Sequence, residues 1–213
     1  MADTGQGDEI GPVEKGRHAY FIFGRFNPPT IGHKVLIDNL IKTSHEHHAD
    51  AYVFATSTQD EKKNPLRVEE KVEILKMMYP DPDTVRIINT TEKGCKSIPV
   101  VLSALRRVGY EDLTLVAGSD RVPDFQGKFK GLAVVPGGER DPDADDATGM
   151  SATIARTAAM QGDVEKFKRS MNNSVRGKNA IYNTIRRRLG AAKRGGSRKR
   201  VRSTRRRLRK ARQ

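Results

Sequence analysis

The stretch that decides the fold is GRFNPPTIGH, from Gly24 to His33. It follows a short apolar run, AYFIF, and leads into KVLIDNL, whose apolar residues have helical spacing. The inner side of that helix is expected to hold Val35, Leu36, Leu40 and Ile37. The two prolines fit a strand-to-helix turn, because proline has no N–H to donate and is tolerated in the first turn of a helix. A plain connection needs only a turn and a cap, so the threonine, glycine and histidine that follow require a further explanation.

Strands and helices are predicted to alternate on both sides of this turn. Apolar runs predict strands at 19–23, 50–56, 84–89, 113–119 and 132–137. Helical spacing predicts helices at 31–45, 66–80, 98–109, 151–161, 163–171 and 178–190. The strands are apolar throughout, which is typical of strands buried on both faces. We therefore predict an α/β fold with a Rossmann-like, doubly wound parallel sheet, helices on both faces, further C-terminal helices and a basic disordered tail.

Composition divides the 213 residues into four parts. Residues 1–17 are polar and are expected to form a flexible arm. Residues 18–162 form the α/β domain, and residues 163–192 form helices packed on or beside it. Residues 193–213 are a low-complexity basic tail.

The sequence gives no sign of secretion or of a membrane partner. Its first residues lack the apolar segment of a signal peptide, and no apolar run approaches the roughly 18 residues of a membrane span. The single cysteine, Cys95, excludes an internal disulfide and fits a reducing environment. We expect an intracellular, reducing compartment: the cytoplasm, with a nuclear or virion-associated location as alternatives.

The turn after the first strand has the residues of an anion site. A helix that begins near Thr30 directs its first N–H groups toward a ligand above the sheet, where doubly wound sheets bind ligands. Thr30 and His33 are three residues apart and share a face of the first helical turn, and Gly32 lets a ligand approach the backbone. The alternative is that Thr30 is only a helix cap and His33 an ordinary exposed residue. The position after the first strand of an alternating chain favours a site for negative charge, including that of a transition state.

A second loop-to-helix junction, GMSATIAR at 149–156, has the same character. Ser151 and Thr153 supply hydroxyl groups, and Arg156 lies on the same side of the helix as Thr153. Alone, this segment would also fit a capped helix with a surface arginine. Two such junctions about 120 residues apart predict a phosphate cradle suited to a polyphosphate.

Both motifs resemble those of the nucleotidylyltransferase superfamily, in which a His- or Thr-x-Gly-His motif follows the first strand. The residues that match this first motif are Gly24, Phe26, Asn27, Pro28, Thr30, Gly32 and His33. Thr30 stands where many members have the first histidine. Ser151, Thr153 and Arg156 match the second motif, Ser-x-Thr-x-x-Arg.

Two further segments extend the resemblance to about residues 18–190. VAGSDRVPDF at 116–125, with Gly118 and Asp120, is similar to the Gly-x-Asp segment of nicotinamide mononucleotide adenylyltransferases. KKNPLRVEEKVEILKMMYP resembles the lysine-bearing loop and helix of many relatives, especially phage-encoded cytidylyltransferase-like proteins.

The resemblance implies that an acceptor phosphate attacks the α-phosphate of a nucleoside triphosphate in line and that pyrophosphate leaves. His33 would stabilise the α-phosphate with Thr30 beside it, and Lys62 or Lys63 would reach the same charge. The remaining residues expected to bind the nucleotide are Gly24, Phe26, Asn27, Gly32, Gly118, Asp120, Ser151, Thr153 and Arg156. Mg²⁺ would be carried mainly by the triphosphate, so no protein ligand to a metal is predicted.

The substrates stay open at this point. ATP is favoured over CTP, and nicotinamide mononucleotide is the first choice of acceptor. Phosphopantetheine, phosphoalcohols and sugar phosphates remain as alternatives. The sequence gives no indication of the oligomeric state.

The basic tail suggests a nucleic-acid partner. Residues 193–213 hold 12 Lys or Arg and no acid, whereas the rest of the chain has 28 basic and 26 acidic residues. Such a segment stays unfolded alone and binds RNA or DNA phosphates without base specificity. The expected contacts are Arg198, Lys199, Arg200, Arg202, Arg205, Arg206 and Arg207. A nuclear targeting signal is an alternative for the tail. A structural or nucleic-acid-associated component of a virion or ribonucleoprotein, with weak or no catalysis, is the alternative for the whole chain.

Overall fold

The computed structural model describes residues 17–138 and 150–190. The predictions for the N-terminal arm before Arg17 and for the basic tail, with its seven expected nucleic-acid contacts, lie outside the described residues.

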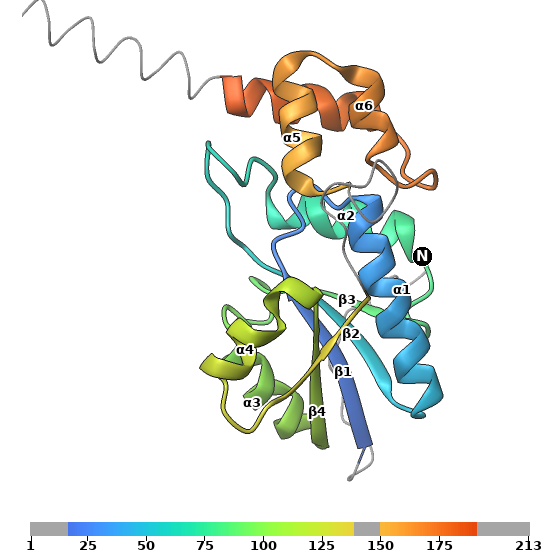
Figure 1. Cartoon of the computed structure of the whole chain (residues 1–213), viewed down its shortest axis with the longest axis vertical. Coiled ribbons are helices and arrows are strands. Elements are labelled where there is room, and N and C mark those ends of the chain that lie inside the picture. Colours follow the sequence, from blue (N-terminus) through green and yellow to red (C-terminus); the bar gives the residue numbers. More distant parts are fainter. Residues whose placement is uncertain (1–16, 139–149, 191–213) are drawn as a thin grey trace, which may run out of the picture.

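Five parallel strands form one sheet in the order β3-β2-β1-β4-β5 (Figure 1). The strands are β1 (Arg17–Gly24), β2 (Asp50–Ala55), β3 (Arg86–Asn89), β4 (Tyr110–Ala117) and β5 (Ala133–Pro136). The order reverses beside β1, because the chain builds outward through β2 and β3 and then returns to β4 on the other side. This arrangement confirms the predicted doubly wound α/β sheet.

Helices cover both faces of the sheet. Alternate side chains of the strands pack on α1 (Ile31–Glu46) and α2 (Val68–Met78) on one face. The other set packs on α3 (Ile98–Val108), and residues of α4 (Val122–Lys128) lie against that cluster. The central strands are therefore buried on both faces, which explains their continuous apolar sequences.

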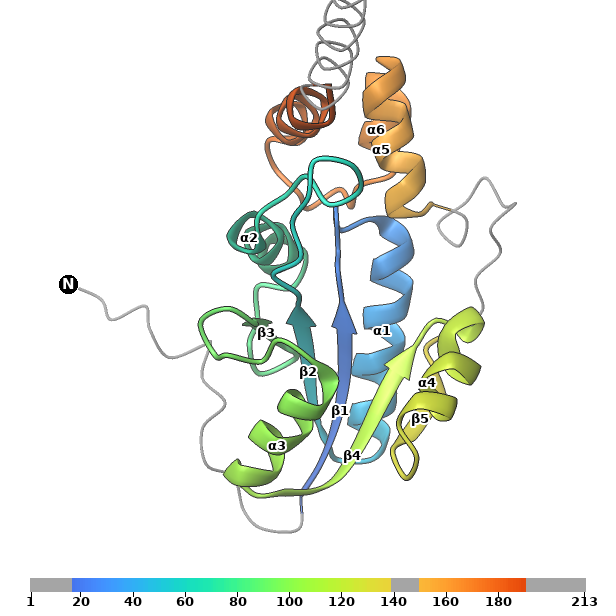
Figure 2. The same ribbon diagram turned by 90° about the vertical axis from the view of Figure 1, so that its left-hand side faces the viewer.

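A helical cap lies over the carboxyl ends of the strands. The cap consists of α5 (Ala152–Gln161), α6 (Val164–Arg169) and a last helix over residues 178–190. Its apolar side chains form a third core with Leu66 and with Ile74 and Met78 of α2. In Figure 2 the strand arrows point toward this cap, drawn in orange and red.

Three local details differ from the sequence predictions. The fourth strand ends at Ala117, so Gly118 is outside it, and the segment that follows forms a 3-10 turn and α4, a helix that was not predicted. In α1 the buried residues are Ile37, Leu40 and Ser44, whereas Val35 and Leu36, expected on the inner side, are only partly buried. The side chain of Leu36 instead lies against Gly137, just after β5.

Candidate functional site

The two predicted junctions lie at the edge of the sheet that faces the cap. The chain leaves β1 at Gly24 and leaves β4 at Ala117, and these two strands are neighbours. Their carboxyl ends flank the point where the strand order reverses. This is where open α/β sheets form a ligand crevice.

Hydrogen bonds at the start of α1 determine the chemical state of His33. Thr30 is the fully buried N-cap residue, and its backbone N–H donates to Nδ1 of His33 at 3.1 Å. The Thr30 hydroxyl oxygen lies 2.9 Å from the same nitrogen. Because Nδ1 accepts a backbone N–H, the neutral ring carries its proton on Nε2. His33 therefore presents an N–H donor, suited to a phosphate oxygen, at the opposite end of the ring.

The backbone at this junction is less available to a ligand than the sequence suggested. The Thr30 N–H is bonded to His33, and the Ile31 N–H donates to the Ser170 carbonyl of the cap at 2.9 Å. No acidic side chain lies in the first turn of α1, so the positive end of the helix is not neutralised there. Gly32, partly buried in this first turn, is next to His33.

The glycine and aromatic residues of the motif shape the turn. A Cβ added to Gly24 would lie 2.8 Å from the Phe26 ring, so only glycine leaves room for that side chain. Phe26 is itself buried, and its ring centroid is 5.1 Å from that of His33. The structure therefore places Gly24 and Phe26 as supports for the histidine.

Asn27 joins the turn to the segment before α2. It is buried, its Nδ2 donates to the Leu66 carbonyl at 3.1 Å, and the Leu66 N–H donates to its Oδ1 at 2.9 Å. The partner is 39 residues away in the chain. The nitrogen and the oxygen of the Asn27 side chain are thus both bonded to the backbone of Leu66. The backbone carbonyl of Asn27 points toward the second junction.

Arg156 brings the two junctions together. Its Nη1 donates to the Asn27 carbonyl at 2.7 Å, across 129 residues of sequence, and its Nη2 donates to Thr153 Oγ1 at 3.0 Å. Ser151 is the N-cap of α5 and accepts the Ile154 N–H at 3.3 Å. The predicted pairing of Arg156 with Thr153 is therefore present beside the first motif.

Two further cations lie at this site and were missed in the sequence. Lys71 of α2 is fully buried, and its Nζ donates to the carbonyls of Thr56 and Thr58 at 2.9 and 2.8 Å. Burial, with a contribution from the charge of Arg25, lowers the pKa of Lys71 to about 8. Burial and then the charge of Arg25 also lower the pKa of Arg156. Arg25, which is exposed, therefore lies close to the buried Lys71 and to the partly buried Arg156.

The sequence held a signal for each of them. Lys71 interrupts the apolar stripe of α2, three residues after Val68, and a lysine at such a position needs specific partners. Arg25 stands between two matched residues of the first motif.

Lys62 and Lys63 lie on an exposed loop whose backbone is organised by Asp60. Oδ1 of Asp60 accepts the N–H groups of Lys62 and Lys63 at 2.8 and 2.6 Å. The backbone N–H of Lys63, with the side chain of Asn64, holds the pKa of Asp60 well below its ordinary value. Within the described residues, neither lysine ammonium bonds to His33 or Thr30.

Gly118 and Asp120 lie just beyond the carboxyl end of β4. A Cβ on Gly118 would lie 2.8 Å from Oδ1 of Asp120, so the carboxylate is close to the glycine backbone. Asp120 is exposed in the 3-10 turn Ser119–Arg121. The strand order places this turn beside the first junction, although residues 17–138 and 150–190 show no hydrogen bond between Asp120 and that junction.

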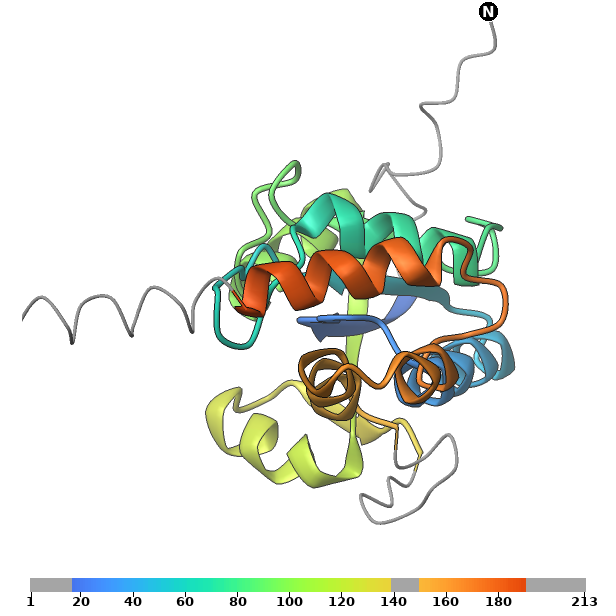
Figure 3. The same ribbon diagram turned by 90° about the horizontal axis from the view of Figure 1, so that it is seen from above.

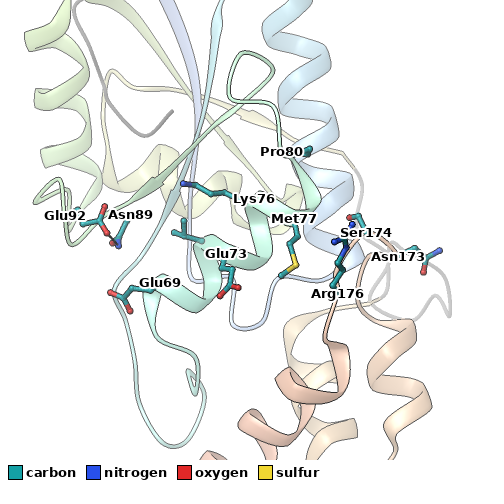
Figure 4. A pocket seen from close by; sticks show the side chains of 11 residues that line it. Glu69, Glu73, Lys76, Met77, Pro80, Asn89, Glu92, Asn173, Ser174 and Arg176 are labelled. Carbon is teal, nitrogen blue, oxygen red and sulfur yellow. Dashed lines mark hydrogen bonds between the residues drawn. The ribbon is translucent and has the colours of Figure 1, made fainter. Parts of the chain in front are cut away.

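A cavity of about 1000 Å³ lies elsewhere, along the outer side of α2 (Figure 4). Its lining includes Glu69, Glu73 and Lys76 of α2 and residues near Asn89 and Arg176. None of the lining residues belongs to either junction. The candidate site is therefore the sheet edge and not this cavity.

The described residues contain no group of three His, Cys, Asp or Glu side chains placed to hold a metal ion. None of the helices described here has the length and apolar character needed to cross a membrane.

Comparisons with known proteins agree with this geometry. A family model described as cytidylyltransferase-like matches residues 21–158, which include both junctions. A comparison with curated proteins gave no match.

Three solved structures share the fold. One is a protein assigned as a nicotinate-nucleotide adenylyltransferase from Vibrio parahaemolyticus, with 19% identity, a TM-score of 0.52, and coverage of 79% of this chain and 98% of its own. The nicotinic acid mononucleotide adenylyltransferase of Plasmodium falciparum is 12% identical in two complexes, with NaAD and with APC. The TM-scores are 0.55 and 0.56, and the match covers 79% of this chain and 94% and 97% of theirs.

At these low identities the solved structures support only the fold. Membership of a family rests on the match to the family model. This match spans well over half of the chain and contains both junctions. The chain belongs to the cytidylyltransferase-like family, within the nucleotidylyltransferase superfamily that its two motifs indicated.

Proposed function

We propose that the protein transfers a nucleoside monophosphate from ATP to a phosphate-bearing acceptor and releases pyrophosphate. The observation that carries this proposal is the contact of Arg156 with the Asn27 carbonyl, which joins the two motifs that we propose to bind phosphate. Arg25 lies close enough to Lys71 and to Arg156 to act on each of them electrostatically, and a polyphosphate would neutralise these positive charges.

In the proposed reaction, an oxygen of the acceptor phosphate attacks the α-phosphorus. The bond from that phosphorus to the oxygen bridging to the β-phosphate breaks, and the electron pair leaves with pyrophosphate. The Nε2–H of His33 donates to a non-bridging oxygen of the α-phosphate, where negative charge is held during transfer. Arg156, Thr153 and Ser151 hold the β- and γ-phosphates, with Arg25 as an exposed further cation.

The remaining predicted residues act around this centre. Lys62 and Lys63 are carried by a loop that would have to move for their ammonium groups to reach the triphosphate. Asp120 is proposed to contact the acceptor or the ribose. Mg²⁺ accompanies the triphosphate as part of the substrate and shields its charge. Residues 18–162 would supply the nucleotide site, and residues 163–192 would brace it from above.

Adenylyl transfer to a pyridine mononucleotide is the specific reaction that we favour. Support comes from the names of the solved relatives, which are adenylyltransferases for nicotinate or nicotinic acid mononucleotide. The Gly118–Asp120 segment, at the strand end beside β1, is the sequence feature that fits such an acceptor.

The basic tail favours an additional role in nucleic-acid binding. Its 12 positive charges would attach the enzyme to RNA or DNA phosphates, with Arg198, Lys199, Arg200, Arg202, Arg205, Arg206 and Arg207 as contacts. The same tail would suit a structural component of a ribonucleoprotein or virion. The hydrogen bond from Thr30 to His33 and the contact of Arg156 with the Asn27 carbonyl favour the enzyme.

Pyrophosphate release by the purified full chain tests the proposal. The assay uses Mg²⁺ with ATP or CTP and a panel of acceptors: nicotinamide and nicotinic acid mononucleotides, phosphopantetheine, phosphoalcohols and sugar phosphates. His33→Ala should lower kcat by roughly 10²- to 10³-fold, since it removes one donor to the transition state. His45→Ala, at an exposed position in the last turn of α1, is the matched control and should leave kcat unchanged.

The opposite result is equally clear. If no triphosphate and acceptor pair gives pyrophosphate, and triphosphate binding is the same in the native chain and His33→Ala, the catalytic proposal fails. The structural role would then be the better description.

A further inference from the structure

The last helix of the cap, residues 178–190, lies beyond the part of the chain that matches the family model. Tyr182, Ile185 and Leu189 are its buried side chains, and they join the core that contains Ile74 and Met78 of α2. Figure 3, from above, shows this helix in red alongside α2 in teal. Besides this apolar packing, the helix makes polar contacts at the start of α2 through Arg188.

Arg188 makes three hydrogen bonds at the start of α2. Its Nη1 donates to Glu70 Oε2 at 2.6 Å and to the Pro65 carbonyl at 2.7 Å, and its Nη2 donates to Glu70 Oε1 at 2.8 Å. The two side chains are only 20% and 34% exposed. A planar guanidinium bound to both carboxylate oxygens is geometrically fixed, which an ammonium group cannot reproduce.

The contact with Arg188 also affects the pKa of the Glu70 carboxyl group. Burial alone would raise the pKa of Glu70, but hydrogen bonds from Arg188 and from the Arg67 backbone outweigh it and leave the pKa below its ordinary value. The Arg67 N–H donates to Glu70 Oε2 at 2.7 Å, so the pair also fixes the N-cap residue just before α2.

These bonds continue into the candidate site. Pro65 is followed by Leu66, whose N–H and carbonyl are both bonded to the Asn27 side chain. The Asn27 carbonyl in turn accepts from Arg156. An unbroken series of contacts therefore runs from the last helix through Pro65, Leu66 and Asn27 to the arginine of the second motif.

We propose that Arg188 is a positioning residue for nucleotidyl transfer: by holding Pro65 and Leu66 against Asn27, it fixes Arg156 for the triphosphate. This inference rests on the proposed function. Arg188 touches neither junction directly and acts through the 65–66 segment, which also ends the loop that carries Lys62 and Lys63. Displacement of a binding group by about 1 Å is enough to cost up to 10²-fold in rate.

Steady-state kinetics of variants test this role at a temperature where every variant is folded. Arg188→Ala should raise the KM for the triphosphate or lower kcat, with kcat/KM falling about tenfold or more. Arg188→Lys keeps the charge and should recover only part of the loss, because it cannot bind both carboxylate oxygens and the carbonyl. Arg187→Ala, at the exposed neighbouring position, should change kcat/KM by less than about twofold.

A double variant distinguishes an effect through the Arg188–Glu70 contact from a general weakening of the last helix. Glu70→Gln should reproduce part of the Arg188→Ala effect, and the two changes together should cost little more than Arg188→Ala alone, since they break one interaction. Full additivity would contradict the proposed connection.

Hydrogen exchange gives a readout that does not need activity. Arg188→Ala should increase exchange in peptides that span Leu66 and the 25–33 turn, whereas Arg187→Ala should not. If the native chain releases no pyrophosphate, the proposed function has failed, and the exchange result still decides whether Arg188 holds the turn. The inference is overturned if Arg188→Ala lowers only the melting temperature, with kcat, KM and exchange in both segments unchanged.

Discussion

At the residue scale, the backbone N–H of Thr30 does more for His33 than the Thr30 hydroxyl. The N–H donates to Nδ1 and keeps the proton on Nε2, whatever side chain occupies position 30. Thr30→Val should therefore lower kcat less than His33→Ala does, and should cost about 1 kcal/mol of stability through loss of the helix cap. Pyrophosphate release and urea unfolding measure both effects, and equal losses of kcat in the two variants would contradict this assignment.

Gly24 and Gly127 offer a matched pair of substitutions. A Cβ at Gly24 would meet the Phe26 ring at 2.8 Å, whereas one at Gly127 in α4 would meet nothing within 4 Å. Gly24→Ala should destabilise the protein by roughly 1–3 kcal/mol, because the buried ring must move. Gly127→Ala should be neutral or stabilising by up to about 1 kcal/mol, as expected in a helix. Thermal unfolding of both variants checks the contrast, and similar melting temperatures would show that Phe26 yields easily.

At the scale of elements, α2 is attached to the end of β2 by a buried ammonium group. Lys71 bonds the carbonyls of Thr56 and Thr58, just beyond the strand, and its pKa is lowered to about 8 from 10.5 by burial. Between these values the unfolded chain holds more protons than the folded chain, so the contribution of Lys71 to stability rises with pH.

The Lys71→Met variant tests this sign. The free energy of unfolding of the native chain, relative to Lys71→Met, should increase from pH 8 to pH 10, with a slope of at most about 1.4 kcal/mol per pH unit. Urea unfolding of both proteins at pH 7, 8, 9 and 10 provides the measurement. A constant difference over this range would show that the lysine keeps its ordinary pKa.

At the scale of the whole molecule, we expect different parts of the chain to bind nucleic acid and to catalyse the transfer. The tail holds 12 basic residues, and the other 192 residues are nearly neutral. Replacing Arg198, Lys199, Arg200, Arg202, Arg205, Arg206 and Arg207 by serine should weaken RNA or DNA binding and reduce its dependence on salt, by about 0.7 in slope for each lost contact to single-stranded phosphate.

Pyrophosphate release should be unchanged in that variant, since no tail residue belongs to the proposed site. Fluorescence anisotropy with a 20-nucleotide RNA at several salt concentrations measures the binding. Tight binding by the variant at moderate salt would assign nucleic-acid recognition to the folded part of the chain.

The sequence alone determined the architecture and both junctions. Continuous apolar runs marked strands buried on both faces, and helical spacing between them predicted the parallel, doubly wound sheet. Thr30 and Ser151 were recognisable as the residues before two helices because a cap is a local feature, decided by the residue and its next few neighbours. The short helix α4 was missed because seven residues that include a proline and a glycine give little periodic signal.

Tertiary structure alone decided which residues meet. Asn27 bonds Leu66 across 39 residues, Arg188 bonds Glu70 across 118, and Arg156 bonds Asn27 across 129. The place of Lys71 in an apolar stripe indicates burial, but helical spacing could not identify its partners, the carbonyls of Thr56 and Thr58. A local pattern reports the conformation of a segment. Which group a buried polar side chain bonds depends on which distant segments come into contact. The packing of the sheet, α2 and the cap determines those contacts.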